Sequence, residues 1–477
     1  MELPAEVQSI LETLQEAGWE AFAVGGCVRD LLSGREPADW DVATKAKPAE
    51  IQKLFPKNFY TNQFGTVTVL TGSKKTTLKE IEVTTYRIDV GYSDKRRPDE
   101  VKFTDRIEED LARRDFTINA MALDGERVVD PFGGQKDLEA KLVRAVGNPE
   151  ERFNEDALRL MRAMRLAAQL SFAIERETKE AIKKLAADIE AISQERIRDE
   201  LIKIVMSSAP EKGFNLLEET GLLKRVMPEL AEGVGVDQNK HHTFTVFEHG
   251  VKSLQYAANY NYSLVIRLAA LWHDIGKTRT RRAKGNDYTF YAHDVVSARM
   301  TEKLMKRLRF SNELIRDVGH LVRHHMFYYD VGKVTEAGAR RLLRRVGKDH
   351  FDDLIKLRIA ERKGSGVPKA EPYRLRHLQF MVDKASREPV SVGELAIKGG
   401  DLIGELKLLP SPVIGGILNA LLAEVLDDPK KNNREYLLKR ARELQNEDAE
   451  ELKALGESAK DAEEKRREDE IRRKYHV

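Results

Sequence analysis

The chain has 477 residues, of which 41% are hydrophobic and 34% are charged, yet its formal net charge at pH 7 is only +2. This length predicts three or four domains with real cores, and the weak net charge means that a nucleic-acid partner would depend on local basic patches. The single cysteine, Cys27, excludes an internal disulfide and fits a reducing cytoplasm.

The first 18 residues have the pattern of an amphipathic helix with acidic residues, which is unlike a secretory signal peptide. No later segment has the apolar length that a membrane span requires. We therefore expect no membrane partner.

Residues 24–45, VGGCVRDLLSGREPADWDVATK, predict a loop, a short helix, a turn and a strand. On such a strand Asp39 and Asp41 point to one face, while Trp40 and Val42 point to the other. Two carboxylates above an apolar anchor suit Mg²⁺, which prefers oxygen ligands and often binds through a few carboxylates and substrate phosphates. A solvated strand end is the alternative, because an isolated D-x-D pattern is common.

Gly25 and Gly26 would let a phosphate approach the backbone closely, and Arg29 could donate charge-assisted hydrogen bonds to its oxygens. The combination GGxVRD…DxD resembles the head of the polymerase-beta-type nucleotidyltransferases. Its wording is similar to that of the class II tRNA nucleotidyltransferases and the bacterial poly(A) polymerases. This resemblance implies that Asp39 and Asp41 are catalytic and hold two Mg²⁺ ions, and that the two glycines and Arg29 bind the nucleotide.

Residues 64–70 and 78–87 are rich in β-forming residues and predict the two strands of a hairpin. Glu80 and Glu82 share one face of the second strand. In the family that the chain resembles, a carboxylate within a sequence motif like EVTTYR lies beside the two aspartates. The resemblance therefore implies that Glu82 is a third catalytic carboxylate, whereas Glu80 fits a solvated strand face nearly as well.

Residues 91–101, GYSDKRRPDEV, are polar, basic and rich in turn formers, so they predict a mobile loop. They match the flexible loop of enzymes that add CCA or A to tRNA, and enzymes that add only CC generally lack this loop. The resemblance thus favours the ability to add the terminal A.

Residues 111–121, LARRDFTINAM, combine apolar anchors with charged side chains, which predicts that the charges have fixed positions. RRD alone is often a surface ion pair. The longer wording RRDFTINA resembles a family signature whose first arginine contacts the nucleotide, and that role falls on Arg113.

Residues 155–170, EDALRLMRAMRLAAQL, predict one helix. Asp156, Arg159, Arg162 and Arg165 recur every three residues on it and lie on a slowly rotating stripe. An ordinary helix-surface ion pair is the alternative. The order of EDxxR after RRDFTINA resembles the class II enzymes and implies that Asp156 and Arg159 select the base, while Arg162 and Arg165 stack on the base or contact the triphosphate.

The proposed base selection has a simple chemical basis. An aspartate accepts hydrogen bonds and an arginine only donates them. Cytosine and adenine both present an amine donor beside a ring-nitrogen acceptor, so one Asp–Arg pair matches either base. Guanine and uracil would mismatch both groups, and each buried unpaired polar group costs roughly 1–3 kcal/mol.

Histidines gather between residues 241 and 325, and imidazole together with carboxylate suits a divalent transition metal. Their order H…HD…H…HH resembles the HD phosphohydrolase superfamily and implies a second metal site at His249, His273 and Asp274. That superfamily usually ends its site with a late aspartate, where this chain has Glu361. An active hydrolase and a helical body that merely retains the histidines both remain open.

Residues 335–445 are helical in pattern and basic in places, notably at Arg340, Arg341, Arg344 and Arg345, which fits either a solvated face or an RNA-backbone contact. Residues 446–477 are polar and lack an apolar stripe, so they predict an exposed helix or disorder.

The resemblance implies an α+β protein with a polymerase-beta-like nucleotidyltransferase head containing a mixed sheet, followed by an all-α neck and an HD-like helical body. The expected parts are a head (1–146), a neck for base selection and RNA binding (147–230), an HD-like domain (231–365), a C-terminal helical body that contacts tRNA (366–445) and a charged tail (446–477).

The implied reaction is template-independent addition of C, C and A to the tRNA 3′ end from CTP and ATP, with Mg²⁺ and release of pyrophosphate. Addition of A alone and poly(A) synthesis are alternatives within the same family. An HD-type metal-dependent phosphohydrolase, whose head only binds RNA, is the alternative from another class.

Overall fold

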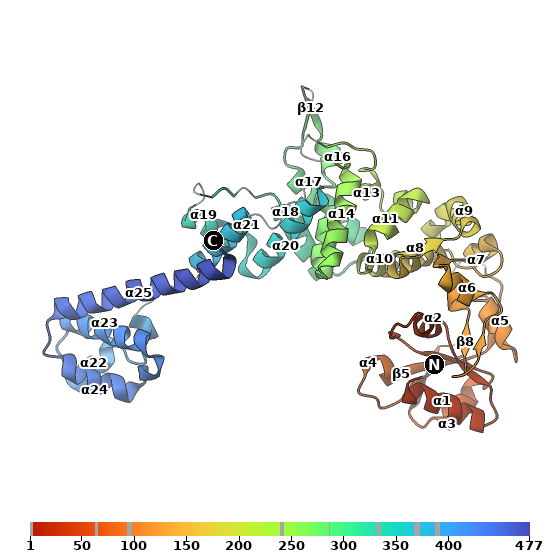
Figure 1. The fold of residues 1–477 in the computed structure, drawn as a ribbon, viewed down its shortest axis with the longest axis horizontal. Coiled ribbons are helices and arrows are strands. Elements are labelled where there is room, and N and C mark those ends of the chain that lie inside the picture. Colours follow the sequence, from red (N-terminus) through yellow and green to blue (C-terminus); the bar gives the residue numbers. More distant parts are fainter. Residues whose placement is uncertain are drawn as a thin grey trace. The chain divides into compact units, whose positions relative to one another are not determined.

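The computed structural model describes residues 3–62, 65–92, 98–238, 243–285, 287–327, 329–331, 335–366, 373–386 and 392–477 (Figure 1). The chain forms two compact units, a first unit of Met1–Met326 with Asp353–Pro368 and a second unit of Phe327–Asp352 with Lys369–Val477. The expected boundaries after residues 146, 230, 365 and 445 stay predictions.

The first unit begins with a seven-stranded sheet in the order β3–β4–β5–β2–β1–β8–β9. Strands β2 and β5 run parallel, whereas the other neighbouring pairs are antiparallel, so the expected mixed sheet is confirmed. The elements of this region are α1 (Ala5–Glu16), β1 (Ala21–Val24), α2 (Gly26–Leu32), β2 (Asp41–Thr44), α3 (Pro48–Leu54), β3 (Asn58–Asn62), β4 (Thr66–Leu70), α4 (Thr76–Lys79), β5 (Glu80–Thr85), β6 (Arg87–Val90), β7 (Glu100–Phe103), α5 (Ile107–Ala112), β8 (Ala122–Leu123), β9 (Val128–Val129), α6 (Gly134–Glu139) and β10 (Leu142–Val143).

Strand β1 is buried on both faces, because two apolar clusters sandwich it. Its alanines pack with α1 residues such as Leu14 in one cluster, while Phe22 packs with Tyr86 in the other. Burial of a large apolar side chain contributes about 1.5–3 kcal/mol, so this core fixes β1 and its neighbour β2 firmly. Beneath the acidic pair, Trp40 and Val42 are buried as predicted.

Strand β5 alternates between buried and exposed residues, and Glu80 and Glu82 share its exposed face as predicted. Antiparallel pairing of β4 and β5 confirms the expected hairpin, although α4 stands in its connection. Strands β6 and β7 flank the predicted mobile loop, of which residues 93–97 lie outside the described residues.

Helices follow the sheet from residue 149 onward: α7 (Pro149–Glu155), α8 (Leu158–Leu170), α9 (Arg176–Leu185), α10 (Gln194–Val205), α11 (Pro210–Glu219), α12 (Leu222–Val226) and α13 (Pro228–Ala231), with the short strand β11 (Ala173–Ile174) pairing with β10. The prediction of one helix over 155–170 was wrong. Asp156 interrupts it with an extended backbone, and its Oδ1 accepts a hydrogen bond from the backbone N–H of Leu158 at 3.0 Å. Helix α8 therefore starts after Asp156.

The rest of the first unit is helical, apart from the hairpin of β12 (Arg282–Lys284) and β13 (Asp287–Thr289). Its helices are α14 (Val246–Asn259), α15 (Leu264–Trp272), α16 (Lys277–Thr280), α17 (His293–Arg307), α18 (Asn312–His324) and the C-terminal part of α20 (Lys348–Gly364), which are drawn from green to cyan in Figure 1.

The second unit contains α19 (Glu336–Val346), the start of α20, α21 (Tyr373–Ser386), α22 (Gly399–Leu406), α23 (Pro412–Asp427), α24 (Arg434–Leu444) and α25 (Ala449–Tyr475). Helix α25 packs along α23 (Figure 1), and its Leu452, Gly456 and Ile471 are buried. The charged tail thus forms a helix whose residues are mostly exposed, as predicted, and its few buried residues dock it against the second unit. None of the described helices is long and apolar enough to cross a membrane.

Candidate active site

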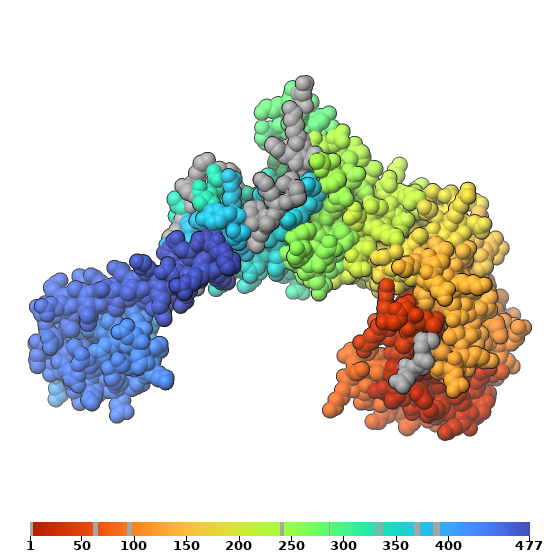
Figure 2. Space-filling model, in the orientation of Figure 1, coloured from red at the N-terminus to blue at the C-terminus, as the bar shows by residue number. Residues whose placement is uncertain are grey.

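A cleft of about 1020 Å³ opens between the sheet and helices α8 and α10. In Figure 2, the residues of the sheet on one side of the cleft are coloured from red to orange, and the helices on the other side are yellow. The structure brings together every residue predicted for the transfer site, because all of them line the cleft: Gly25, Gly26, Arg29, Asp39, Asp41, Glu82, Arg113, Asp156, Arg159, Arg162 and Arg165. Their individual roles stay predictions.

Three carboxylates gather at one end of the sheet strands. Asp41 is the first residue of β2 and pairs across the ladder with Glu82 of β5, and Asp39 lies two residues before Asp41. Burial, and then the neighbouring Asp39 and Glu82, raise the pKa of Asp41 to about 6, while the nearby Arg114 opposes this shift. The three carboxylates repel one another, and a divalent cation that prefers oxygen ligands would relieve this repulsion.

Arg114 lies at the bend between β1 and α2. Gly25 has a φ of +85°, and a Cβ built there would stand 2.6 Å from Nη1 of Arg114. The glycine therefore permits both the left-handed backbone and the close approach of the guanidinium. Sequence reasoning missed Arg114, because the resemblance assigned the nucleotide contact to its neighbour, although the doublet RRD offered both.

Arg113 also lines the cleft, but its guanidinium is bound to a carboxylate. Its Nε and Nη2 donate to Oδ1 of Asp110 at 2.9 and 2.8 Å. Asp110 is fully buried in α5. Burial by itself would raise its pKa, but the charges of Arg113 and Arg114 outweigh burial and hold the pKa below the usual range. Asp110 is thus a second residue that the sequence prediction missed.

Arg29 projects from α2 into the cleft with a fixed guanidinium. It donates to both oxygens of Asp30 at 2.9 Å and, through Nη1, to Oδ1 of Asn119 at 2.6 Å. These bonds hold a cation close to Gly25 and Gly26, where phosphate oxygens could approach.

Asp156 and Arg159, the predicted base-selecting residues, both have other partners in this structure. Oδ2 of Asp156 accepts from Nη2 of Arg196 on α10 at 2.9 Å. Arg159 donates to the carbonyl oxygens of Arg152 and Arg113 at 2.9 Å, and it forms an ion pair with Glu155 at 2.5 Å. A nucleotide base would have to exchange some of these partners.

The next two arginines of α8 are held by buried carboxylates. Arg162 donates to Oδ2 of Asp115 at 2.6 Å, and Arg165 donates to Oε1 of Glu200 on α10 at 2.9 Å. Burial opposes ionisation of Asp115, but Arg162 and Asn119 outweigh it and keep its pKa below the usual range. Helix α10 thus contributes Arg196 to the wall of the cleft, while its Glu200 holds Arg165 of that wall.

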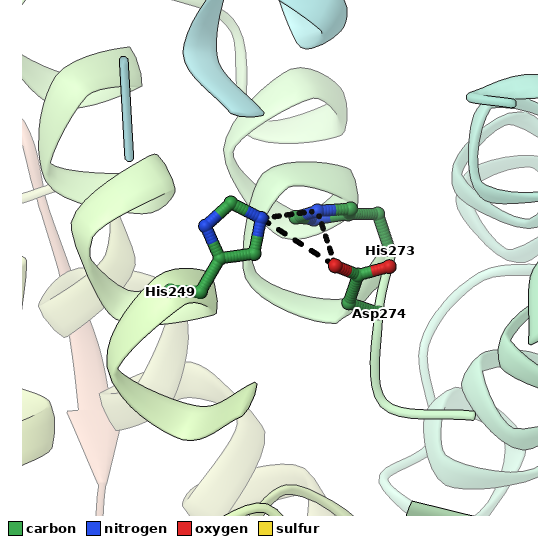
Figure 3. A group of neighbouring side chains, drawn as sticks. All are labelled: His249, His273 and Asp274. Carbon is green, nitrogen blue, oxygen red and sulfur yellow. Dashed lines mark hydrogen bonds and ion pairs between the residues drawn. The ribbon is translucent and has the colours of Figure 1, made fainter. Parts of the chain in front are cut away.

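A second constellation lies among helices α14–α18. Figure 3 shows His249, His273 and Asp274 facing one another. Their facing atoms, Nε2 of each histidine and Oδ2 of the aspartate, are 3.1–3.4 Å apart. Oδ1 of the same aspartate lies 3.3 Å from Nε2 of His293 and 3.6 Å from Nε2 of His325.

The hydrogen bonds around these histidines orient their Nε2 atoms toward the centre. Nδ1 of His273, His293 and His325 lies 2.7–2.9 Å from the carbonyl oxygen three residues earlier, which assigns Nδ1 as the donor and makes Nε2 the acceptor of the neutral ring. Burial, and then His273, lower the pKa of His249 to about 3, so that this imidazole is neutral near pH 7. Ligands about 2.0–2.2 Å from one ion lie roughly 2.8–3.6 Å apart at octahedral or tetrahedral angles, so the donor set fits a divalent metal.

Two cations compete for carboxylates near this centre. Nζ of Lys277 lies 2.6 Å from Oδ2 of Asp274, and Nη1 of Arg358 lies 2.6 Å from Oε1 of Glu361. Burial by itself would raise the pKa of Glu361, but the positive charge of Arg358 outweighs burial and lowers this pKa to about 2. His324, which the sequence placed beside His325, instead contacts the ring of His320.

Comparison with known proteins bears on both sites. Residues 21–144 match the family described as "Poly A polymerase head domain", residues 171–233 match "Probable RNA and SrmB-binding site of polymerase A", and residues 246–360 match "HD domain". A CCA-adding enzyme of Lactiplantibacillus plantarum is 36% identical over 92% of this chain and 97% of its own length. This chain belongs to the tRNA nucleotidyltransferase family.

Two further similarities bear on the reaction of this tRNA nucleotidyltransferase. An A-adding tRNA nucleotidyltransferase of Deinococcus radiodurans is 34% identical over 84% of this chain and 90% of its own length. The crystal structure of a Bacillus stearothermophilus CCA-adding enzyme in complex with CTP has a TM-score of 0.59 and 28% identity, and the match covers 93% of this chain and 99% of that one.

The enzyme is thus a nucleotidyltransferase with an HD domain, as the sequence predicted. Nucleotidyltransferase and HD domains generally use divalent metals, and in the described part of the chain the ligand atoms that lie within 4.8 Å of one another are those of the histidine centre. The match to the head domain contains the three carboxylates of the cleft, and the match to the HD domain contains the histidine centre.

Proposed function

We propose that this tRNA nucleotidyltransferase adds C, C and A to the 3′ end of tRNA, using CTP and ATP and releasing pyrophosphate. The observation that carries the proposal is the cleft lined by the carboxylates of Asp39, Asp41 and Glu82 together with Asp156 and a group of arginines. The relatives named CCA-adding enzymes support it, as does the expected loop at residues 91–101.

In the proposed reaction the 3′ oxygen of the RNA bonds to the α-phosphorus of the nucleotide. The bond from that phosphorus to the bridging oxygen breaks, and pyrophosphate leaves with the electron pair while the hydroxyl proton is lost to solvent. Asp39, Asp41 and Glu82 would hold Mg²⁺, which when bound makes the 3′-hydroxyl easier to ionise and neutralises charge on the triphosphate.

The arginines of the cleft would position the triphosphate by charge-assisted hydrogen bonds. Arg29 and Arg114 stand beside the glycine bend, and Arg162 and Arg165 stand on α8 with their guanidiniums already fixed by carboxylates. A preorganised set of cations needs little rearrangement when the charge develops on the leaving pyrophosphate.

Base selection would use Asp156 as acceptor and Arg159 as donor. Arg159 would have to give up one present partner to reach the base, and Asp156 keeps a free lone pair while bound to Arg196. Guanine and uracil would present a carbonyl to Asp156 and a ring N–H to Arg159, and the resulting unpaired groups disfavour them by roughly 1–3 kcal/mol each.

A second candidate is addition of A alone, which the similarity to the Deinococcus enzyme favours. Three tRNA transcripts that end before CCA, after C and after CC would each receive CTP, ATP or both, with Mg²⁺. Addition of C, C, A and then a stop is the expected result. Extension of only the CC-ended transcript with ATP would replace the proposal by A addition, and long A tails would replace it by poly(A) synthesis.

The histidine centre favours a separate metal-dependent phosphohydrolase activity of the HD domain. We expect His249, His273 and Asp274 to hold a divalent transition metal, with His293 and His325 on the other oxygen of Asp274. Metal analysis of purified protein should find an ion that Asp274→Asn removes and His324→Ala retains. Equal metal content in both variants would reject the site.

The two activities are separable by one substitution in each region. Asp39→Ala should abolish nucleotide addition and leave phosphatase activity toward a generic phosphomonoester unchanged. Asp274→Asn should abolish the phosphatase activity and leave nucleotide addition unchanged. Loss of both activities in either variant would contradict two independent sites.

A further inference from the structure

A chain of hydrogen bonds runs through the wall of the cleft from α2 to α8, and Asn119 is its central member. Oδ1 of Asn119 accepts from Nη1 of Arg29 at 2.6 Å, and its Nδ2 donates to Oδ1 of Asp115 at 3.1 Å. The other oxygen of Asp115 accepts from Nε of Arg162 at 2.6 Å. We name these four residues the Asn119 relay, because they connect a cation on α2 to a cation on α8.

The backbone that carries Asn119 is held by close packing. Asn119 is 7% exposed and ends the 3₁₀ helix η1 (Thr117–Asn119). Its neighbour Thr117 donates from Oγ1 to Oδ2 of Asp137 on α6 at 2.6 Å. A Cβ built on Gly134 of α6 would stand 2.3 Å from the carbonyl oxygen of Thr117, so the glycine is what lets α6 approach η1 this closely. The amide of Asn119 therefore starts from a fixed point.

The two partners of Asn119 make opposite demands that a single amide can meet. Arg29 only donates hydrogen bonds, and an ionised Asp115 only accepts them. A carboxylate at position 119 would repel Asp115, and an ammonium group there would repel Arg29. Turning the amide over would place donor against donor and acceptor against acceptor, so the two partners also set the orientation of the amide.

Both arginines of the relay keep N–H groups for a further ligand. A guanidinium carries five N–H groups. Arg29 directs two of them to Asp30 and one to Asn119, and Arg162 faces Asp115 with Nε and Nη2. The remaining N–H groups are available to the oxygens of an anion in the cleft, and they belong to two cations whose positions are coupled.

We propose that Asn119 is a positioning residue for the triphosphate of the incoming nucleotide. It holds Arg29 and Arg162 in register, so that both guanidiniums meet one triphosphate without rearrangement. This role rests on the proposed function, which assigns both arginines to the triphosphate. The relay does not include the base-selecting pair of Asp156 and Arg159, so it acts on all nucleotides alike.

The test compares Asn119→Ala with Thr117→Val in the full-length protein. Each substitution removes a hydrogen bond from a buried side chain of η1, but only Asn119 lines the cleft. Titration calorimetry in Mg²⁺ with CTP, ATP and inorganic tripolyphosphate measures affinity without turnover, and CMP is the ligand with a single phosphate. Extension of a tRNA transcript gives the KM values for nucleotide and for tRNA.

Asn119→Ala should bind CTP, ATP and tripolyphosphate roughly tenfold more weakly, the size expected for one charge-assisted hydrogen bond. Its KM for each nucleotide should rise by a similar factor. Its affinity for CMP, its KM for tRNA and its ratio of CTP to UTP incorporation should stay near wild type. Thr117→Val should lose stability and keep all of these affinities. Equal triphosphate affinity in the two variants would overturn the inference, and so would an equal loss for CMP.

A double substitution tests the connection to α8. Arg162→Lys should weaken tripolyphosphate binding in the wild-type protein, and it should weaken binding clearly less in Asn119→Ala, where Arg162 is no longer held in register. The same lysine combined with Thr117→Val should show its full effect. Full additivity of Asn119→Ala and Arg162→Lys would reject the relay. Asn119→Ser, whose shorter hydroxyl cannot reach both partners, repeats the comparison with a polar side chain.

Failure of the proposed function would be visible separately. Wild-type protein that binds CTP and ATP but extends no transcript would reject CCA addition, and the calorimetric comparison would still decide the role of Asn119. Completion of CCA by wild type, together with wild-type triphosphate affinity in Asn119→Ala, would reject only the inference about Asn119.

Discussion

Arg196 donates a hydrogen bond from Nη2 to Oδ2 of Asp156 at 2.9 Å, and this bond joins α10 to the break between α7 and α8. The other oxygen of Asp156 accepts from the backbone N–H of Leu158. Both oxygens are thereby fixed, so the direction in which Asp156 can accept from a nucleotide base is set by a residue outside the predicted recognition pair.

Substitution of Arg196 by glutamine should therefore weaken base discrimination more than catalysis itself. We expect the ratio of CTP to UTP incorporation, and of ATP to GTP incorporation, to fall roughly tenfold, which corresponds to one lost charge-assisted hydrogen bond. Single-turnover extension of a tRNA transcript with each of the four nucleotides measures this ratio. The matched control is Arg198→Gln on the same helix, whose guanidinium pairs with Asp199. Equal ratios in the two variants would show that Arg196 only supports the fold.

Replacement of Asp41 by asparagine should separate chemistry from stability. Loss of a carboxylate that would hold Mg²⁺ should lower nucleotide addition by about a thousandfold. The metal-free protein should become more stable, because burial and the adjacent acids raise the pKa of Asp41 to about 6 and so disfavour the charged form. The gain near pH 7 should be at most about 3 kcal/mol. Thermal unfolding in EDTA measures this gain in stability, and Glu80→Gln is the control. A lower unfolding midpoint for Asp41→Asn than for wild type would contradict the prediction.

A methyl group at Gly25 should disturb the site through Arg114. Gly25 and Gly34 both have positive φ angles, +85° and +67°, but only the Cβ at position 25 would meet the guanidinium. Both alanine variants should lose about 1 kcal/mol of stability from backbone strain. Only Gly25→Ala should also raise the KM for nucleotides severalfold, because Arg114 must move away. If the two variants had similar KM values for nucleotides, the hypothesis that Arg114 contacts the nucleotide would be rejected.

The strands and the composition of the cleft could be predicted because their signals are local. Alternation in β5 and the apolar neighbours of Asp41 follow directly from the two-residue period of a strand, and they fixed which carboxylates share a face. The histidine centre was predicted differently, from the gathering of histidines between residues 241 and 325 and from the resemblance of their order to the HD superfamily, and the structure places His249, His273 and Asp274 side by side.

What the sequence did not predict depends on tertiary pairing. At the break, the side chain of Asp156 accepts a hydrogen bond from the backbone N–H of Leu158, a competition with helical hydrogen bonding that helical spacing cannot reveal. The roles of Arg114, Arg196 and Glu200 depend on which cation meets which carboxylate across the cleft. Docking of α25 rests on a few small or apolar contacts that no amphipathic stripe announces.

The ion pair of Asp115 and Arg162 should make part of the stability of the head depend on pH. Oδ1 of Asp115 accepts from the backbone N–H of Phe116 and from Asn119, and Oδ2 accepts from Arg162. Burial alone would favour the neutral acid, but these donors outweigh it, so the pKa is lower in the folded than in the unfolded protein. A carboxyl with a depressed folded pKa stabilises the protein above its unfolded pKa, and this contribution disappears as the pH falls through the folded value.

Asp115→Asn should therefore lower the free energy of unfolding by about 1–3 kcal/mol near pH 7, since a charged hydrogen-bond partner of Arg162 is lost. The difference from wild type should stay constant down to roughly pH 4, where free aspartate begins to protonate, and should narrow below it. Urea unfolding at a series of pH values between 3 and 7 measures this difference. Asp105→Asn, at an exposed position close in sequence, is the control and should change stability little. A difference between Asp115→Asn and wild type that grows as the pH falls would reverse the sign of this argument and show that Asp115 is neutral in the folded enzyme.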